Sequence, residues 1–187
     1  MKPLQSMAMG LVVIAIFARV NGDYDLLPDP AGWLLVLHGL SGLPGPVPHL
    51  PHRPALRSLG LVALLTSVVL WVPDLARGLE STDESLLWAA TLPQIGFVAV
   101  LCTALARVSA AADDRSAASW LRTACTLTVA AGVLPIFVYV ADPALLVPML
   151  LVALLGLVLT IVLLFRYASR PWAISAEPRE VDQTVPR

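Results

Sequence analysis

Six stretches of apolar residues divide this chain of 187 residues. They cover residues 4–20, 31–47, 58–72, 86–106, 117–141 and 144–165. A bilayer core about 30 Å thick takes about 20 helical residues per crossing. The last three stretches reach that length, and the first three are shorter. The pattern predicts an all-α fold, a polytopic transmembrane bundle of about six helices that occupies residues 1–170.

Two features near the N-terminus leave alternatives open. His38, Gly42 and Pro44 weaken the second stretch, so a re-entrant hairpin with five crossings in total is the rival of six. The first stretch could also be a signal peptide cleaved after Gly22. Arg19 interrupts the region before that site, and no A-x-A pattern is present, so we expect an uncleaved helix.

The distribution of positive charge predicts the orientation. With six crossings and the N-terminus inside, ten of the twelve lysines and arginines fall on the cytoplasmic side, and only Arg19 and Arg77 fall outside. Short loops rich in these residues stay cytoplasmic. Both termini are therefore expected inside, and the polar, proline-bearing residues 171–187 are expected to form a disordered cytoplasmic tail.

Composition agrees with a membrane location. Hydrophobic residues make up 58% of the chain and charged residues 13%, against about 45–50% and about 25% in ordinary globular proteins. Eleven of the twelve cations are arginine, and alanine, leucine and valine dominate the apolar residues, which indicates a GC-rich bacterial genome. We expect a multi-pass protein of the cytoplasmic membrane whose surroundings are the lipid bilayer, with no nucleic-acid partner.

A few polar residues inside the apolar stretches are the candidate binding residues. His38 is the only ionisable side chain well inside a stretch, and such groups are costly in lipid. Gln94 follows Pro93, which frees a backbone carbonyl, and that combination occurs at substrate sites of transporters as well as at ordinary helix kinks. Tyr139 ends a face of small and polar residues, namely Cys125, Thr128, Gly132 and Pro135, for which Gly156 and Thr160 are the expected packing partners.

Aromatic residues near the ends of the stretches are expected to be interface anchors. They are Trp33, Trp71, Trp88, Tyr167 and Trp172. Proline–aspartate turns recur in the three outer loops at residues 28–31, 73–76 and 142–144. Helix capping explains two of them, and a shared cation site is the alternative.

No motif points to catalysis or to a bound cofactor. The chain has no glycine-rich phosphate loop, no HExxH, no G-x-S-x-G and no CxxC. His49 and His52 lie three residues apart in a proline-rich connector without a third ligand nearby, which is a poor zinc site. Cys102 and Cys125 do not form a disulfide framework. We expect neither an enzyme nor a metal protein.

The segment NGDYDLLPDPAGW, residues 21–33, resembles a turn in uncharacterised small multi-pass membrane proteins of bacteria. Those proteins carry an acidic LPD-x-x-G-[WY] turn ahead of a hydrophobic helix. The resemblance covers about the first quarter of the chain and implies a multi-pass protein without an assigned activity. Asp25, Asp29 and Trp33 are the candidate binding residues that it adds; as structural elements, Asp29 would cap the second helix, Gly32 would permit close packing and Trp33 would anchor it.

Together these features predict a structural or accessory membrane protein that acts through helix–helix association, with itself or with another membrane protein. The alternative is a small-solute or ion transporter with a polar path near His38, Gln94 and Tyr139. An intramembrane enzyme or redox protein is a third hypothesis, and the redox function requires Cys102 and Cys125 within bonding distance of each other. Transport predicts a polar cavity, whereas an accessory role predicts a dry bundle in which small residues face one another.

Overall fold

The computed structural model describes residues 2–16, 19–20, 24–25, 29–43, 52–71, 84–140 and 146–173 of the chain. This part contains six α-helices and a terminal 3-10 turn: α1 (Pro3–Ala15), α2 (Asp29–Ser41), α3 (Arg53–Trp71), α5 (Glu84–Ala111), α6 (Arg115–Val140), α7 (Leu146–Tyr167) and η2 (Pro171–Ala173). The predicted all-α bundle is confirmed. The predicted tail begins at residue 171, but Pro171–Ala173 form η2. Residues 174–187 lie outside the described residues.

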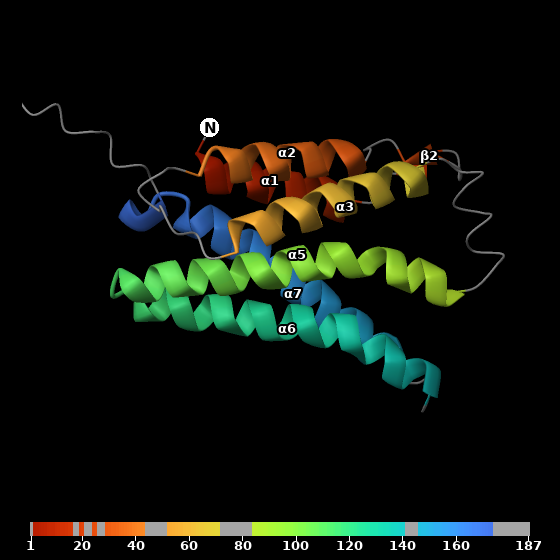
Figure 1. Cartoon of the computed structure of the whole chain (residues 1–187). Helices are drawn as coiled ribbons and strands as arrows, with labels where there is room; N and C mark the ends of the chain where they lie inside the picture. Colours follow the sequence, from red (N-terminus) through yellow and green to blue (C-terminus); the bar gives the residue numbers. More distant parts are fainter. Residues whose placement is uncertain are drawn as a thin grey trace, which may run out of the picture.

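Successive helices run in opposite directions (Figure 1). Four of them are long and apolar enough to cross a membrane. These four are α3, α5, α6 and α7. The predicted starts of the third, fourth and fifth helices are too late, because Arg53, Glu84 and Arg115 already belong to them. Polar residues extend a helix beyond the apolar core into the interface, where water satisfies their side chains.

The first two helices are shorter than the sequence predicts. The expectation that they run to residues 20 and 47 is wrong, because α1 ends at Ala15 and α2 at Ser41. Each has 13 residues, or about 20 Å of helix, which alone is too short for a crossing. Two-residue strands, β1 (Arg19–Val20) and β2 (Tyr24–Asp25), pair antiparallel beyond them. This pair continues the α1–α2 hairpin toward the end of the bundle where α3 finishes (Figure 1).

Glycines close the α1–α2 hairpin. A Cβ atom built on Gly32 would lie 2.7 Å from the Gly10 carbonyl oxygen, and one on Gly39 would lie 2.6 Å from the Pro3 carbonyl oxygen. Atoms cannot approach so closely, so only glycine allows the two backbones to pack in this way. The Ser6 hydroxyl donates to the Leu35 carbonyl at 3.0 Å and links the two helices further. The predicted close packing at Gly32 is confirmed.

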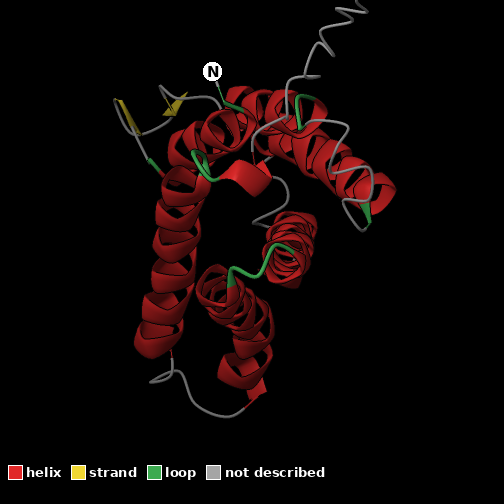
Figure 2. Ribbon diagram, turned by 90° about the vertical axis from the view of Figure 1, so that its left-hand side faces the viewer, coloured by secondary structure: helices red, strands yellow, loops and turns green. Residues whose placement is uncertain are grey.

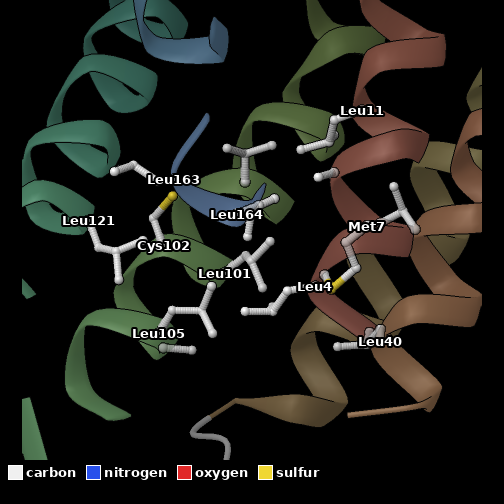
Figure 3. Packing of buried hydrophobic residues seen from close by; sticks show 14 of the residues in the cluster. Leu4, Met7, Leu11, Leu40, Leu101, Cys102, Leu105, Leu121, Leu163 and Leu164 are labelled. Atoms are coloured by element: carbon white, nitrogen blue, oxygen red, sulfur yellow. The ribbon is translucent and has the colours of Figure 1, made fainter. Parts of the chain in front are cut away.

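Helix α5 lies in the middle of the bundle and contacts both α3 and α6, while α7 packs against α6 and α1 (Figures 1 and 2). Leucines from α1, α5 and α7 meet between them, and Figure 3 shows Leu4, Leu101 and Leu164 converging in this core. The core continues between α5 and α6, where Cys102 and Leu121 are buried. One apolar core therefore joins the N-terminal hairpin to the C-terminal helices.

Candidate functional site: a cationic rim at one end of the bundle

Most of the described cations lie at one end of the bundle. This end contains the start of α1, α3 and α6 and the finish of α2, α5 and α7 (Figure 1). We call it the cationic rim, and it is formed by Lys2, His52, Arg53, Arg57, Arg107, Arg115, Arg122, Arg166 and Arg170. The described carboxylates at this end are Asp113 and Asp114. The excess of positive charge at the rim matches the distribution that the sequence predicts.

Arg53 ties the end of α2 to the beginning of α3. Its Nη2 atom donates to the carbonyls of Leu43 at 3.2 Å and of Leu40 and Ser41 at 3.4 Å. These carbonyls belong to the last turn of α2 and the residues after it, where a helix has no internal donors for them and carries a partial negative charge. The guanidinium therefore supplies the missing donors, although its Nε atom is buried without a partner.

His52 and Arg107 form a second contact between elements at the rim. Nη1 of Arg107 lies 3.2 Å from Nε2 of His52, and both side chains are exposed. His52 has a φ angle of 66°, a conformation that residues other than glycine rarely adopt. The backbone before α3 thus holds an uncommon conformation at the point where the imidazole reaches α5.

Asp114 organises the opposite side of the rim. One carboxylate oxygen accepts a hydrogen bond from the backbone N–H of Ala117 at 3.1 Å, which caps α6. The other oxygen accepts from Trp172 Nε1 at 3.4 Å and lies 3.8 Å from Arg170 Nε. The hydrogen bond from Ala117 lowers the pKa of Asp114, and the interactions with Trp172 and Arg170 add to this effect.

A shallow depression accompanies this cluster. Its volume is about 350 Å³, and it is lined by Ala112, Asp113, Asp114, Arg170, Pro171 and Trp172. The ring of Trp172 also packs on Tyr167, with centroids 5.8 Å apart. Asp114 therefore fixes the chain that follows α7 against the turn between α5 and α6, and the depression is part of this anchoring.

The candidate residues of the transport hypothesis do not converge. The sequence predicts that His38 lies deep within a long helix. In the structure His38 is exposed and lies in the last turn of α2, near the rim. Gln94 is half-buried and lies about 25 Å along α5 from its rim end. Its amide makes no hydrogen bond to a described residue. Tyr139 belongs to α6, and its side chain lies outside the described part of the chain.

The three candidates from the acidic turn are also separated by the fold. Asp25 belongs to β2, and its side chain is not among those described. Asp29, the predicted cap, is itself the first residue of α2, so the helix begins one residue earlier than predicted. Trp33 is only 1% exposed and packs edge to face on Phe97 at 5.3 Å. Its predicted role as an interface anchor is therefore wrong, because α2 turns it toward α5 and into the core.

The other aromatic residues have varied surroundings. Trp71 is 48% exposed at the end of α3, and Trp120, which the sequence analysis did not single out, is equally exposed. Trp88 donates from Nε1 to the Gly132 carbonyl at 3.3 Å. The hydroxyl of Thr91 donates to the Trp88 carbonyl at 2.7 Å, close to Pro93. Side chains of α5 thus donate to backbone carbonyls of α5 and α6, the two helices that contain an internal proline.

The predicted small-residue face of α6 is a packing surface. A Cβ on Gly156 of α7 would lie 3.4 Å from the Thr128 backbone nitrogen, and one on Gly132 would lie 3.0 Å from Ile95 of α5. Thr128 and Thr160 both donate to carbonyls of their own helices at 2.8 Å. Packing between α5, α6 and α7, and no polar path, accounts for this face in the described residues.

Both cysteines are free. Cys102 faces Thr160 of α7, with Sγ and Oγ1 3.9 Å apart, and Cys125 lies 3.3 Å from the Thr103 hydroxyl. The two thiols therefore face different partners, and the redox hypothesis gains no support. No group of three potential metal ligands occurs among the described residues. The loops with proline–aspartate turns at residues 73–76 and 142–144 lie outside them.

Sequence reasoning missed the contacts that organise the rim. It placed Arg53, His52 and Arg107 in cytoplasmic connectors and assigned them no contacts. Only one local signal was available: Asp114 comes just before Arg115 and three residues before Ala117, which is the spacing of a helix cap. The contact between His52 and Arg107 joins residues 55 positions apart, and no local pattern reports it.

Comparison with protein-family models, with curated proteins and with solved structures gave no match. The resemblance of the acidic turn to bacterial multi-pass proteins therefore stays a prediction. The fold and the charge distribution define the class: an all-α bundle with four helices able to cross a membrane.

Proposed function

We propose that this chain is a multi-pass protein of the bacterial cytoplasmic membrane that acts through helix–helix association, with itself or with another membrane protein. In this proposal the cationic rim and both termini are cytoplasmic. The shared position of the described cations at one end supports that orientation, because positive residues near membrane helices stay inside. The α1–α2 hairpin begins and ends at the rim. The N-terminus is therefore on the cytoplasmic side in this proposal, whether the hairpin crosses the membrane or is re-entrant.

The observation that favours this proposal over transport is the close packing of the described helices. At four glycines a built Cβ atom would come within 3.0 Å of a neighbouring helix, so a larger residue has little or no room. These are Gly10, Gly32, Gly39 and Gly132. Five buried hydroxyl residues, Ser6, Ser67, Ser109, Thr128 and Thr160, all donate to backbone carbonyls. Hydroxyls that are occupied in this way do not line a path for a polar solute.

Transport is the second candidate, and one observation favours it. Trp33 Nε1 is buried without a hydrogen-bond partner, and the Gln94 amide makes no hydrogen bond to a described residue. Gln94 lies on α5 one turn from Phe97, the ring on which Trp33 packs. Polar groups without partners inside a bundle are costly, and a polar solute could supply the missing partners.

Reconstitution into liposomes distinguishes the two functions. The protein, labelled at a cysteine introduced at the exposed position Ser119 in a variant without Cys102 and Cys125, would be counted by stepwise photobleaching at increasing protein-to-lipid ratios. Association predicts that the dimeric fraction rises with the ratio and that potassium and proton fluxes equal those of protein-free liposomes. A monomer at every ratio, together with a flux that Gln94→Leu lowers tenfold and the exposed control His38→Leu leaves unchanged, would establish transport instead.

A further inference from the structure

A contact between Arg107 and His52, with no carboxylate beside it among the described residues, lies where α3 begins and α5 ends. The Arg107 guanidinium is 3.2 Å from the His52 imidazole. The ion pair that the rim does contain joins Arg170 to Asp114 on another side, and no described carboxylate lies within ion-pair distance of His52 or Arg107. Because arginine has no acceptor, Arg107 donates this hydrogen bond to the ring nitrogen of His52. The guanidinium keeps its charge and its other N–H donors for an anion.

Helix register brings a second cation, Arg122, to the same place. The 3.3 Å contact between Thr103 and Cys125 fixes the level of α5 against the antiparallel α6. Arg107 lies one turn beyond Thr103, and Arg122 lies about one turn before Cys125, so the two arginines are level with each other. Arg122 is exposed.

The surroundings of α6 show to which side Arg122 turns. Leu127 and Thr128 contact Gly156 and therefore mark the side of α6 that faces α7. Cys125 marks the side that faces α5. At 100° per residue, Thr128 and Arg122 lie on opposite sides of Cys125 around the helix axis. Arg122 therefore points away from α7. It therefore flanks α5 on the side where α3 also lies.

An apolar face extends from these cations along the bundle. Arg107, Val100 and Gly96 share one stripe of α5, at spacings of seven and four residues, and a Cβ on Gly96 would lie 3.5 Å from Leu59 of α3. Exposed valines border the stripe on both neighbouring helices: Val62 of α3 is 44% exposed, and Val129 and Val133 of α6 are 47% and 44% exposed. In Figure 1, α5 lies between α3 and α6 along this side. We call this surface the α5 face.

We propose that His52, Arg107 and Arg122 bind the phosphate of an anionic phospholipid whose acyl chain lies on the α5 face. The two arginines and His52 stand at the end of the transmembrane helices, where lipid phosphates lie, and the apolar residues continue from them toward the middle of the bundle. Basic clusters between transmembrane helices recognise anionic headgroups in this way. A soluble phosphate compound would use the cations and leave the α5 face without a role.

This inference rests on the membrane location proposed above and does not depend on helix–helix association. The test uses the full chain purified in detergent, with phosphatidylglycerol titrated in and lipid retention measured by native mass spectrometry. The variants are Arg107→Gln and Arg122→Gln. The matched control is Arg57→Gln, which removes the same charge from an exposed arginine of the rim that has no partner among the described residues. Arg57 lies one turn after Arg53, whose guanidinium reaches the end of α2.

We expect the wild-type protein to retain one phosphatidylglycerol in preference to phosphatidylcholine. Arg107→Gln and Arg122→Gln should each weaken retention about fivefold, as expected for the loss of one cation near a lipid headgroup, and Arg57→Gln should weaken it less than twofold. Circular dichroism confirms that each variant folds, and sedimentation with membranes before extraction tests the location independently of lipid selectivity.

Two outcomes overturn the inference. Equal losses for Arg57→Gln and Arg107→Gln would mean that the rim attracts anionic lipid only through its overall charge. Displacement of phosphatidylglycerol by millimolar glycerol phosphate would mean that the cations bind a soluble phosphate and that the α5 face contributes nothing. If the chain did not sediment with membranes, the membrane location itself would be wrong.

Discussion

Gly10 of α1 and Gly32 of α2 lie backbone against backbone, and no side chain fits between them. A Cβ on Gly32 would come within 2.7 Å of the Gly10 carbonyl oxygen, and one on Gly10 would come within 2.7 Å of the Val36 side chain. The hairpin that these glycines close also carries Trp33, which packs on α5. The position of Trp33 against α5 therefore depends on the close approach of α1 and α2.

Gly10→Val should separate the two helices. The added side chain cannot be accommodated without moving α2, and overpacking of this kind costs about 1–3 kcal/mol. The measurement is the unfolding free energy in detergent. Gly42→Ala is the matched control, because a Cβ at that position would meet only ordinary contacts at 3.6–3.7 Å, and we expect it to change stability by about 0.5 kcal/mol or less. Equal effects of the two substitutions would contradict the packing argument.

Arg53→Gln should weaken the junction of α2 and α3. The substitution removes the guanidinium that donates to the carbonyls of Leu40, Ser41 and Leu43. Hydrogen bonds from a charged donor contribute about 1.5–3 kcal/mol, and hydrogen exchange of the backbone amides at the end of α2 should rise accordingly. Arg57→Gln four residues later removes an exposed arginine and should leave exchange unchanged. Protection that survives Arg53→Gln would show that these bonds do not stabilise the helix end.

The pH dependence of stability should report Asp114. Its folded-state pKa is lowered, chiefly by the hydrogen bond from Ala117, so the ionised carboxylate stabilises the fold above the ordinary pKa of an aspartate. That contribution is lost as the pH falls through the lowered pKa. Arg170 and Arg166 are the cations near this carboxylate.

The comparison that isolates this effect is the melting temperature of the wild type against Asp114→Asn. The difference should be present at pH 7 and should shrink steadily at acid pH, where the wild-type carboxyl is neutral as well. The amide keeps a capping oxygen for Ala117 but removes the charge that Arg170 contacts. A difference that stays constant between pH 7 and pH 3 would mean that ionisation of Asp114 does not stabilise the fold.

Trp33→Phe should cost less stability than its burial implies. Trp33 is 1% exposed, but its Nε1 atom has no hydrogen-bond partner among the described residues. Phenylalanine therefore removes this unpaired donor and keeps a ring against Phe97. We expect a loss of about 1 kcal/mol, against about 3–5 kcal/mol for Trp33→Ala, which leaves a cavity. Both values come from unfolding in detergent. A loss for Trp33→Phe as large as for alanine would indicate that the indole N–H has a partner in the membrane.

Labelling of single cysteines in intact cells should reveal the topology. In a variant without Cys102 and Cys125, cysteines at positions 25 and 80 should react with a membrane-impermeant maleimide, and cysteines at positions 49 and 113 should not. Reaction at position 80 without reaction at position 25 would mean that the α1–α2 hairpin is re-entrant. Four helices would then cross the membrane. Reaction at 113 would place the cationic rim outside and reverse the proposed orientation.

The sequence by itself determined the class of fold, because apolar runs of about 20 residues have no stable alternative to helices in a bilayer. It also determined which residues share an end, since the loops that carry arginine alternate with acidic ones. It indicated correctly that Gly32 permits close packing and that the face containing Thr128 and Gly132 is a packing surface. These features depend on local composition and on helical periodicity, which a single segment displays.

Only the tertiary structure decided what each polar or aromatic residue contacts. Trp33 resembled an interface anchor because it stands near the start of an apolar stretch, yet the rotation of α2 turns it onto Phe97. His38 seemed deep because the stretch continued to residue 47, but α2 ends at Ser41. The contacts of His52 with Arg107 and of Asp114 with Trp172 join residues more than 50 positions apart. Such contacts depend on how helices are placed against one another, and this placement arises from packing over the whole bundle.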